Sequence, residues 1–175
     1  KVLSNHLPKF KKYLARFYSN RDYQILNEIY HIKEIGYKCM EMMLNDDNEN
    51  MIIRFWAATM LGDIKTEEAD NILRKLSTSK NSIVSVFANI ILAQRGFDIN
   101  SQNFETAISL KDAYARAMTA RYIPINHKNL IEKFLDDKDI RVRLYAARQL
   151  YLLENEKAQK KFELALKENI SKNIK

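Results

Sequence analysis

The amino-acid sequence predicts an all-α protein, specifically an α-solenoid in which an N-terminal cap helix precedes about five antiparallel helix pairs. Apolar residues recur at the spacing of an amphipathic helix. The 175 residues include only 3 Gly and 2 Pro, which sheet-rich folds use heavily in tight turns. A motif that begins with Asp or Asn returns every 27 to 31 residues, a period typical of repeat architectures. The chain is therefore expected to form a single domain over residues 1–175.

The first expected element is a cap helix over residues 5–19, within a cap region of residues 1–21. Leu7, Phe10, Leu14 and Phe17 lie at helical spacing, so they form one apolar face. Pro8 would stand in the first turn, where its missing N–H is not needed. We expect this helix to cover the end of the first repeat.

The repeat is clearest at residues 139–150, where Asp139 begins the pattern Asp-x-x-Val-Arg-x-x-Ala-Ala-x-x-Leu. A side-chain oxygen at the first position accepts hydrogen bonds from the free N–H groups of a helix N-terminus. The apolar positions that follow lie on one face of that helix. The copies begin at Asp22, Asn50, Asn81, Asp112 and Asp139, and they delimit units of residues 22–49, 50–80, 81–111, 112–138 and 139–170.

Each unit is expected to contain a first helix, which begins at the motif, and a second helix, which returns along it. Gly36, Gly62 and Gly96 follow three of the first helices, where a left-handed C-terminal residue is favourable, and Pro124 follows the fourth. Apolar faces predict the second helices around residues 37–44, 69–76, 104–108, 130–135 and 158–166. We expect the second helices to line the concave surface.

The motif at residues 139–150, with its copies at 112–123 and 50–61, resembles HEAT-like repeats, in particular the short kind also found in phycobilin lyase subunits. The resemblance covers about residues 22–170. It implies a superhelix of stacked helix pairs, like that of armadillo proteins, and it implies no single function, since such repeats generally serve as interaction surfaces. The unit of residues 81–111 departs from the motif, because Ser85 replaces the Arg and Asn89 replaces an Ala.

Arg54, Arg116 and Arg143 occupy the same position of the repeat. One interpretation is a basic ladder that binds phosphates, and the other is a structural role in which each Arg reaches an Asp or carbonyl group of a neighbouring repeat. The structural role is the prediction, as in similar HEAT-like repeats. Asp112 and Asp139 are likewise assigned to helix capping.

The net charge of +7 is concentrated at the two ends of the chain. Residues 1–40 hold eight Lys or Arg against three Asp or Glu, a net of +5, whereas residues 41–80 hold five against eight, a net of −3. Residues 126–175 hold twelve against eight, a net of +4. Such a balance permits nucleic acid, anionic membrane or acidic protein partners. The candidate binding residues at these basic ends are Lys9, Lys12, Arg16, Lys160 and Lys167, although a solvated helix face is the favoured interpretation of both groups.

No catalytic residue, metal or cofactor is predicted. The three histidines, His6, His31 and His127, are far apart, and they lack the His-Glu pairs that HEAT-like deoxyhypusine hydroxylases carry. Cys39 is the only cysteine, and it lies in an apolar stretch where it is expected to pack as a small hydrophobic residue. The isolated glycines form no phosphate-binding loop.

The favoured function is a non-catalytic scaffold that binds another protein in the cytoplasm. The first alternative is nucleic-acid binding, including the glycosylase activity of HEAT-like enzymes that excise alkylated bases, although Trp56 is expected to pack between helices and not in a base pocket. The second alternative is a cytoplasmic domain that a separate segment tethers to a membrane, because the chain begins with Lys1 and contains no apolar run long enough to span one.

Overall fold

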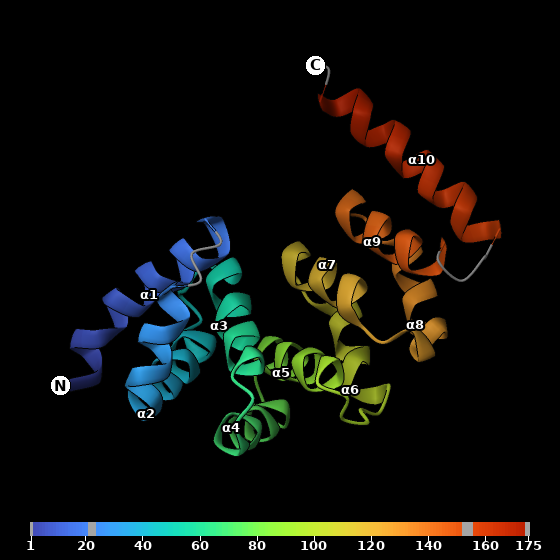
Figure 1. Ribbon diagram of the computed structural model, residues 1–175. Coiled ribbons are helices and arrows are strands. Elements are labelled where there is room, and N and C mark those ends of the chain that lie inside the picture. The colour runs from blue at the N-terminus through green and yellow to red at the C-terminus, as the bar shows by residue number, and fades with distance from the viewer. Residues whose placement is uncertain (1, 21–23, 152–155, 174–175) are drawn as a thin grey trace.

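The computed structural model describes residues 2–20, 24–151 and 156–173, and every regular element in these ranges is a helix. This confirms the predicted all-α class. The helices follow one another through space in chain order and form an open arc, with α1 and α10 at its two ends (Figure 1). The side chains of Phe17 and His31, and the whole of Asp22, lie outside the described residues.

The arc begins with α1 (Val2–Asn20), which contains the predicted cap helix. Phe10 and Leu14 are buried against the following helices, as their spacing predicts, and Tyr13 is buried beside Phe10. Pro8 differs from its predicted place, because the helix begins at Val2 and Pro8 therefore lies inside it. The Pro8 nitrogen has no hydrogen to donate, so one intrahelical hydrogen bond is missing from this part of α1.

The first unit does not form the predicted pair of helices. The helix end predicted at Gly36 is wrong, since α2 (Gln24–Asn45) is a single helix of 22 residues that passes through Gly36. A glycine inside a helix costs only about 1 kcal/mol relative to alanine. The residues that follow it include the fully buried Cys39, Met40 and Leu44, and a continuous helix keeps these side chains in the core. Burial also raises the pKa of the Cys39 thiol, as expected of a cysteine that packs as a hydrophobic residue.

Four first helices and the elements that follow them make up the rest of the arc. The first helices are α3 (Met51–Asp63), α5 (Ser82–Gln94), α7 (Ala113–Tyr122) and α9 (Ile140–Tyr151). The elements that follow them are α4 (Glu67–Ser77), α6 (Gln102–Glu105) with η1 (Thr106–Ser109), η2 (Ile125–His127) with α8 (Lys128–Lys133) and η3 (Phe134–Asp136), and α10 (Glu156–Asn173). The second helices are thus mixed α and 3-10 structure in two of the four units, and Phe104 and Phe134 still anchor them in the core.

The predicted caps are present at all four first helices. The side-chain oxygens of Asn50, Asn81, Asp112 and Asp139 accept hydrogen bonds of 2.8–3.1 Å from the N–H groups of Ile52, Ile83, Ala115 and Arg141. Each of these bonds satisfies an N–H group that the helix itself cannot pair. The leading Asp or Asn of the motif therefore fixes where each first helix begins.

The remaining glycines have two different roles. Gly96 has a φ of 86°, and it ends α5 as predicted, because its N–H and that of Phe97 donate to carbonyls of the last helical turn at 3.0 and 3.1 Å. Gly62 is not a left-handed end residue, since it lies within the last turn of α3. A Cβ atom at Gly62 would lie 2.3 Å from Cγ2 of Ile91, so this glycine lets α3 and α5 approach closely. Pro124 follows the end of α7, as predicted.

No helix in the described ranges is both long and apolar enough to cross a lipid bilayer.

Candidate binding groove

The repeat arginines are joined to the ends of the preceding elements. Arg54 donates from Nε to the carbonyl of Leu44 at 3.0 Å, in the last turn of α2. Arg116 donates from Nη1 to the carbonyl of Leu110 at 2.7 Å, just after η1. Arg143 repeats the contact through Nη1, which lies 2.9 Å from the carbonyl of Asp137, just after η3. Each arginine therefore satisfies a carbonyl group that the end of a helix leaves without an intrahelical partner.

The unit that lacks the arginine makes the same connection with two shorter side chains. The Ser85 hydroxyl donates to the carbonyl of Ser77 at 2.6 Å, at the end of α4, and the Asn89 amide donates to the same carbonyl at 3.1 Å. The departure of this unit from the motif is thus compensated within the unit. We call these five residues the polar seam: Arg54, Ser85, Asn89, Arg116 and Arg143.

Arg116 forms the most complete contact of the polar seam. Its Nε and Nη2 atoms donate to the two carboxylate oxygens of Asp137 at 2.7 and 3.0 Å. Desolvation raises the pKa of Asp137, but the hydrogen bonds from Arg116 and from the Asp139 N–H outweigh it, so the net pKa lies below its usual value. Arg54 and Arg116 are only 1% and 2% exposed. They are inaccessible to a phosphate, and their contacts are those that a structural role predicts.

The candidate residues at the basic ends are exposed but are not brought together. Lys9, Lys12 and Arg16 lie on α1, and Lys160 and Lys167 lie on α10. These two helices stand at opposite ends of the arc (Figure 1). The Lys9 ammonium group lies over the ring of Tyr13, 5.3 Å from its centre. The two groups of cations therefore do not form one continuous surface.

A groove runs along the first helices on the hollowed side of the molecule. It consists of three adjoining hollows of about 400, 300 and 260 Å³. The first two share Thr59 and Gln94, and the last two share Arg121, Tyr122 and Tyr145. All the helical residues that line it belong to α3, α5, α7 and α9. The expectation that second helices line the concave surface is therefore wrong for this groove, because the arc of Figure 1 opens on the side of the first helices.

Aromatic side chains form the middle of the groove. Phe55 is buried and stacks on Tyr122, with ring centres 5.7 Å apart, and it meets Tyr114 edge-on. Burial raises the pKa of Tyr114 to about 12, and the neighbouring Tyr122 and Tyr145 contribute in the same direction. Trp56 is half-buried and lines the same hollow, so it does not lie wholly between helices as predicted. The middle of the groove is thus lined mainly by uncharged aromatic side chains, with Arg121 at its border to the next hollow.

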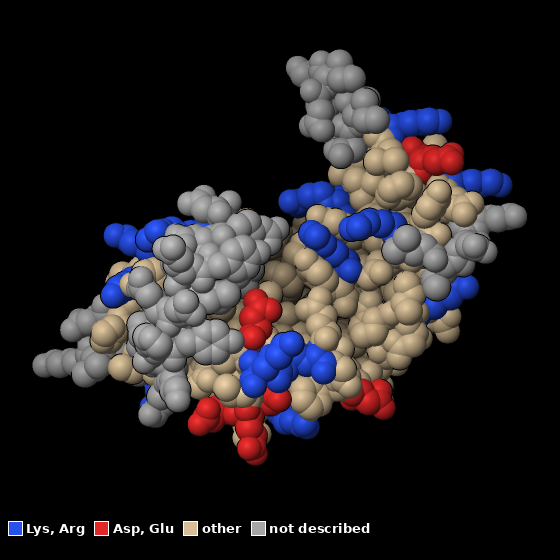
Figure 2. All heavy atoms as spheres, in the orientation of Figure 1, with Lys and Arg blue, Asp and Glu red and all other residues tan. Residues whose placement is uncertain are grey.

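The end of the groove formed by α7 and α9 is cationic. The guanidinium group of Arg121 lies over the rings of Tyr122 and Tyr145, 4.9 and 5.2 Å from their centres. Arg148 is exposed beside them and lines the same hollow. Figure 2 shows Lys and Arg side chains over α7 and α9 at the border of the hollowed face, with acidic side chains on the α3 side.

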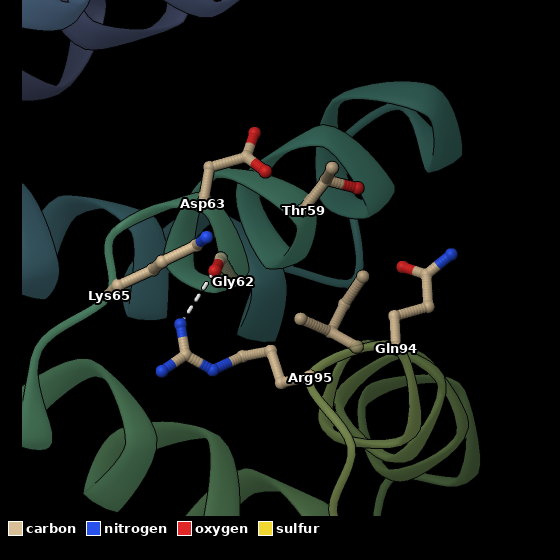
Figure 3. Close-up of a pocket in the computed structure, with 7 residues that line it drawn as sticks. Thr59, Gly62, Asp63, Lys65, Gln94 and Arg95 are labelled. Atoms are coloured by element: carbon tan, nitrogen blue, oxygen red, sulfur yellow. Dashed lines mark hydrogen bonds between the residues drawn. The ribbon is translucent and has the colours of Figure 1, made fainter.

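The opposite end of the groove has a different character. Figure 3 shows Thr59 and Gln94 on opposite sides of this hollow, while Arg95 extends from the end of α5 toward the Gly62 carbonyl. Arg95 donates to that carbonyl at 2.7 Å and pairs with Asp70 at 2.6 Å, so it joins the end of α5 to the end of α3 and to α4. Desolvation raises the pKa of Asp63, and nearby Lys65 opposes this shift.

Sequence reasoning did not identify the residues of the groove, although a signal for them exists. The groove side chains stand six and nine residues after the capping residue in three units: Trp56 and Thr59, Met118 and Arg121, Tyr145 and Arg148. In the remaining unit the same positions hold Phe87 and Ile90, which are buried. These positions lie on the side of each first helix that faces away from the polar seam.

Among the described residues, no group of three or more His, Cys, Asp or Glu side chains is placed to hold a metal ion. Comparison of the chain with family models, with curated proteins and with solved structures found no match. Its function is therefore inferred from the groove and its surroundings.

Proposed function

We propose that this chain is a non-catalytic interaction module, an α-solenoid of HEAT-like repeats that binds another protein along the groove. The observation that carries this proposal is the groove itself, which combines half-buried aromatic side chains with exposed polar ones. The polar seam supports the solenoid part, because four consecutive units make the same connection to the element before them. Regular repetition of one contact is what a stack of repeats requires.

The composition of the groove favours a protein partner. Binding hot spots between proteins are enriched in Trp, Tyr and Arg, and they lie in pockets from which water is excluded. Trp56, Tyr114, Tyr145 and Arg121 supply these residue types along one surface. The three hollows follow one another along four helices, so the partner is expected to bind as an extended segment that places a side chain in each.

Nucleic-acid binding is the alternative, and two features count against it. The cations of α1 and α10 stand at opposite ends of the arc (Figure 1), and Asp63 lines one end of the groove. Every nucleotide carries a phosphate, so a nucleic acid in the groove would place negative charge beside that carboxylate and be repelled by it. Fluorescence anisotropy with short single- and double-stranded DNA and RNA tests this alternative, and binding that weakens steeply with salt would support it.

The protein-binding proposal is tested by photo-crosslinking in an extract of the source cells. A photoreactive residue replaces Gln94, which is exposed in the middle of the groove, and in a matched control it replaces Asn71, which is exposed on α4. We expect the Gln94 variant to form a discrete adduct with a protein and the Asn71 variant to form none. Equal labelling at both positions, or adducts only at Asn71, would contradict binding in the groove.

A further inference from the structure

We propose that the α7–α9 end of the groove recognises an acidic side chain of the partner segment, whose carboxylate binds between Arg121 and Arg148. This inference rests on the proposed function and adds a chemical requirement to the partner. The hollow concerned has a volume of about 260 Å³, and its lining residues are Arg121, Tyr122, Tyr145, Arg148 and Gln149.

The position of Arg121 is fixed by contacts that leave its hydrogen-bonding edge available. Its guanidinium group lies over the rings of Tyr122 and Tyr145, 4.9 and 5.2 Å from their centres, so cation–π contacts hold it beside the hollow. Stacked arginines retain their N–H groups for planar acceptors such as a carboxylate. A guanidinium that is already positioned loses less conformational entropy when it binds an anion.

The charge of this hollow has no partner within the described part of the chain. Neither Arg121 nor Arg148 forms an ion pair with a described residue, whereas the arginines Arg54, Arg95 and Arg116 are each paired with an Asp. Of the described residues that line the hollow, none is acidic. Two cations beside an apolar surface create a positive potential that an anionic group on the partner would complement.

The amide nitrogen of Gln149, which also lines the hollow, is already satisfied. The Gln149 amide donates to the carbonyls of Arg121 and Ile123 at 2.7 and 3.2 Å. This side chain therefore fixes the end of α7 against α9, and the two guanidinium groups remain as donors toward the hollow. A carboxylate has two acceptor oxygens, so it can accept from both arginines at once.

A peptide carboxylate fits the groove better than a nucleic acid does. The ring of Tyr122 already contacts both Phe55 and Arg121, which occupies the surface on which a base would stack. The groove also changes character along its length, from Arg121 on α7 and Arg148 on α9 to Asp63 at the end of α3. A segment with one acidic residue and neutral or apolar neighbours matches this order.

The test begins with random twelve-residue peptides displayed on phage and selected on the whole wild-type chain. We expect the selected peptides to share an Asp or Glu at a fixed distance from apolar residues. A labelled synthetic peptide is then compared with its Glu→Gln analogue by fluorescence anisotropy, on wild-type protein and on the Arg121→Gln and Arg148→Gln variants. The carboxylate and each arginine should contribute about tenfold to affinity, and the Arg→Gln changes should have little further effect on the Gln peptide.

Several outcomes would overturn the inference. Peptides that lose affinity in a Trp56→Ala variant but show no preference for an acidic residue would refute the carboxylate site and leave the proposed function standing. Tighter binding of a phosphoserine analogue, or of single-stranded DNA, would assign the arginines to phosphate. A selection that enriches no peptide would count against both proposals. Thermal unfolding of each variant, followed by circular dichroism, distinguishes lost affinity from lost structure.

Discussion

Arg116 and Arg121 lie five residues apart on α7, and these two arginines have different roles. Arg116 is 2% exposed and is held by Asp137 and by the carbonyls of Leu110 and Lys111. Arg121 is exposed, lies on tyrosine rings and pairs with no described carboxylate. Five residues correspond to nearly half a turn beyond a full helical turn, so the two side chains project from opposite sides of α7.

The comparison extends to the two sides of the helix stack. On the side of the polar seam, arginine, serine and asparagine donors satisfy the ends of helices, and each contact is internal to the fold. On the side of the groove, the first helices meet through aromatic rings and through the close approach at Gly62. The side chains of Gln94, Arg121 and Arg148 are exposed there. We infer that the seam maintains the stack and the groove provides the binding surface, which can be tested by substitutions on either side.

The largest effect on stability is expected for Arg116→Met on the side of the polar seam. The substitution removes the Arg116 donors from two carbonyl groups and from the Asp137 carboxylate, which keeps only the hydrogen bond from the Asp139 N–H among those described. Loss of one partner of a buried ion pair costs about 3–5 kcal/mol of unfolding free energy, which urea denaturation would measure. A loss below about 1 kcal/mol would show that the seam does not stabilise the stack in this way.

A smaller effect is expected for Gly62→Ala, on the side of the groove. The new methyl group would lie 2.3 Å from Cγ2 of Ile91, and overpacking of this kind costs about 1–3 kcal/mol. The higher helix propensity of alanine offsets about 1 kcal/mol of this cost, so the net loss of unfolding free energy should be at most about 2 kcal/mol. In the Gly62→Ala background, Ile91→Ala should cost less than in the wild type, and additive losses would contradict close approach as the reason for this glycine.

The cap of α9 is also expected to make the stability of the protein sensitive to acid. The hydrogen bond from Arg141 lowers the pKa of Asp139 from about 3.8 to about 2, in spite of desolvation, and backbone N–H groups add to the effect. Because the folded-state pKa is depressed, this stabilisation is present above about pH 4 and is lost as the pH falls through 2.

Asp139→Asn keeps a capping oxygen but cannot titrate, so its unfolding free energy should fall less than that of the wild type between pH 4 and 2. Asp139→Ala removes the cap and should cost about 0.5–2 kcal/mol at neutral pH. Denaturant titrations across this pH range would measure both effects. Identical acid profiles for the wild type and Asp139→Asn would exclude Asp139 as a source of the pH dependence.

The smallest effect is expected for Arg148→Gln in the groove. Arg148 is exposed and forms no ion pair with a described residue, and surface substitutions of this kind change unfolding free energy by no more than about 0.5 kcal/mol. A loss above about 1 kcal/mol in a urea titration would show that Arg148 also supports the fold, and it would remove the distinction between the two sides.

The sequence predicted well those features that depend on local chemistry. The caps at Asn50, Asn81, Asp112 and Asp139 are present because a side-chain oxygen next to a helix start has few competing partners. The left-handed residue at Gly96 follows from the same kind of local requirement. The all-α class could likewise be predicted from apolar periodicity and the shortage of turn residues.

Features that depend on tertiary contacts could not be predicted in this way. All three glycines were predicted to end a helix, but the structure places them differently: Gly36 lies inside a helix, Gly62 lies at a close helix contact, and Gly96 ends a helix. The choice depends on what packs nearby, which spacing alone does not reveal. The groove was not predicted for a related reason. The motif is defined by core positions that repeat from unit to unit, whereas the side chains six and nine residues after the capping residue differ between units.

The contact of Phe55 with both Tyr114 and Tyr122 joins α3 directly to α7, across the helix between them. In an ideal linear array each layer touches only its nearest neighbours, and layers can fray one after another from either end. Because the Phe55 ring of α3 contacts α7 past α5, it couples α3, α5 and α7, and these three helices should unfold together. Hydrogen exchange should therefore find α3, α5 and α7 opening with a common free energy, while the two ends of the arc exchange through smaller, independent openings.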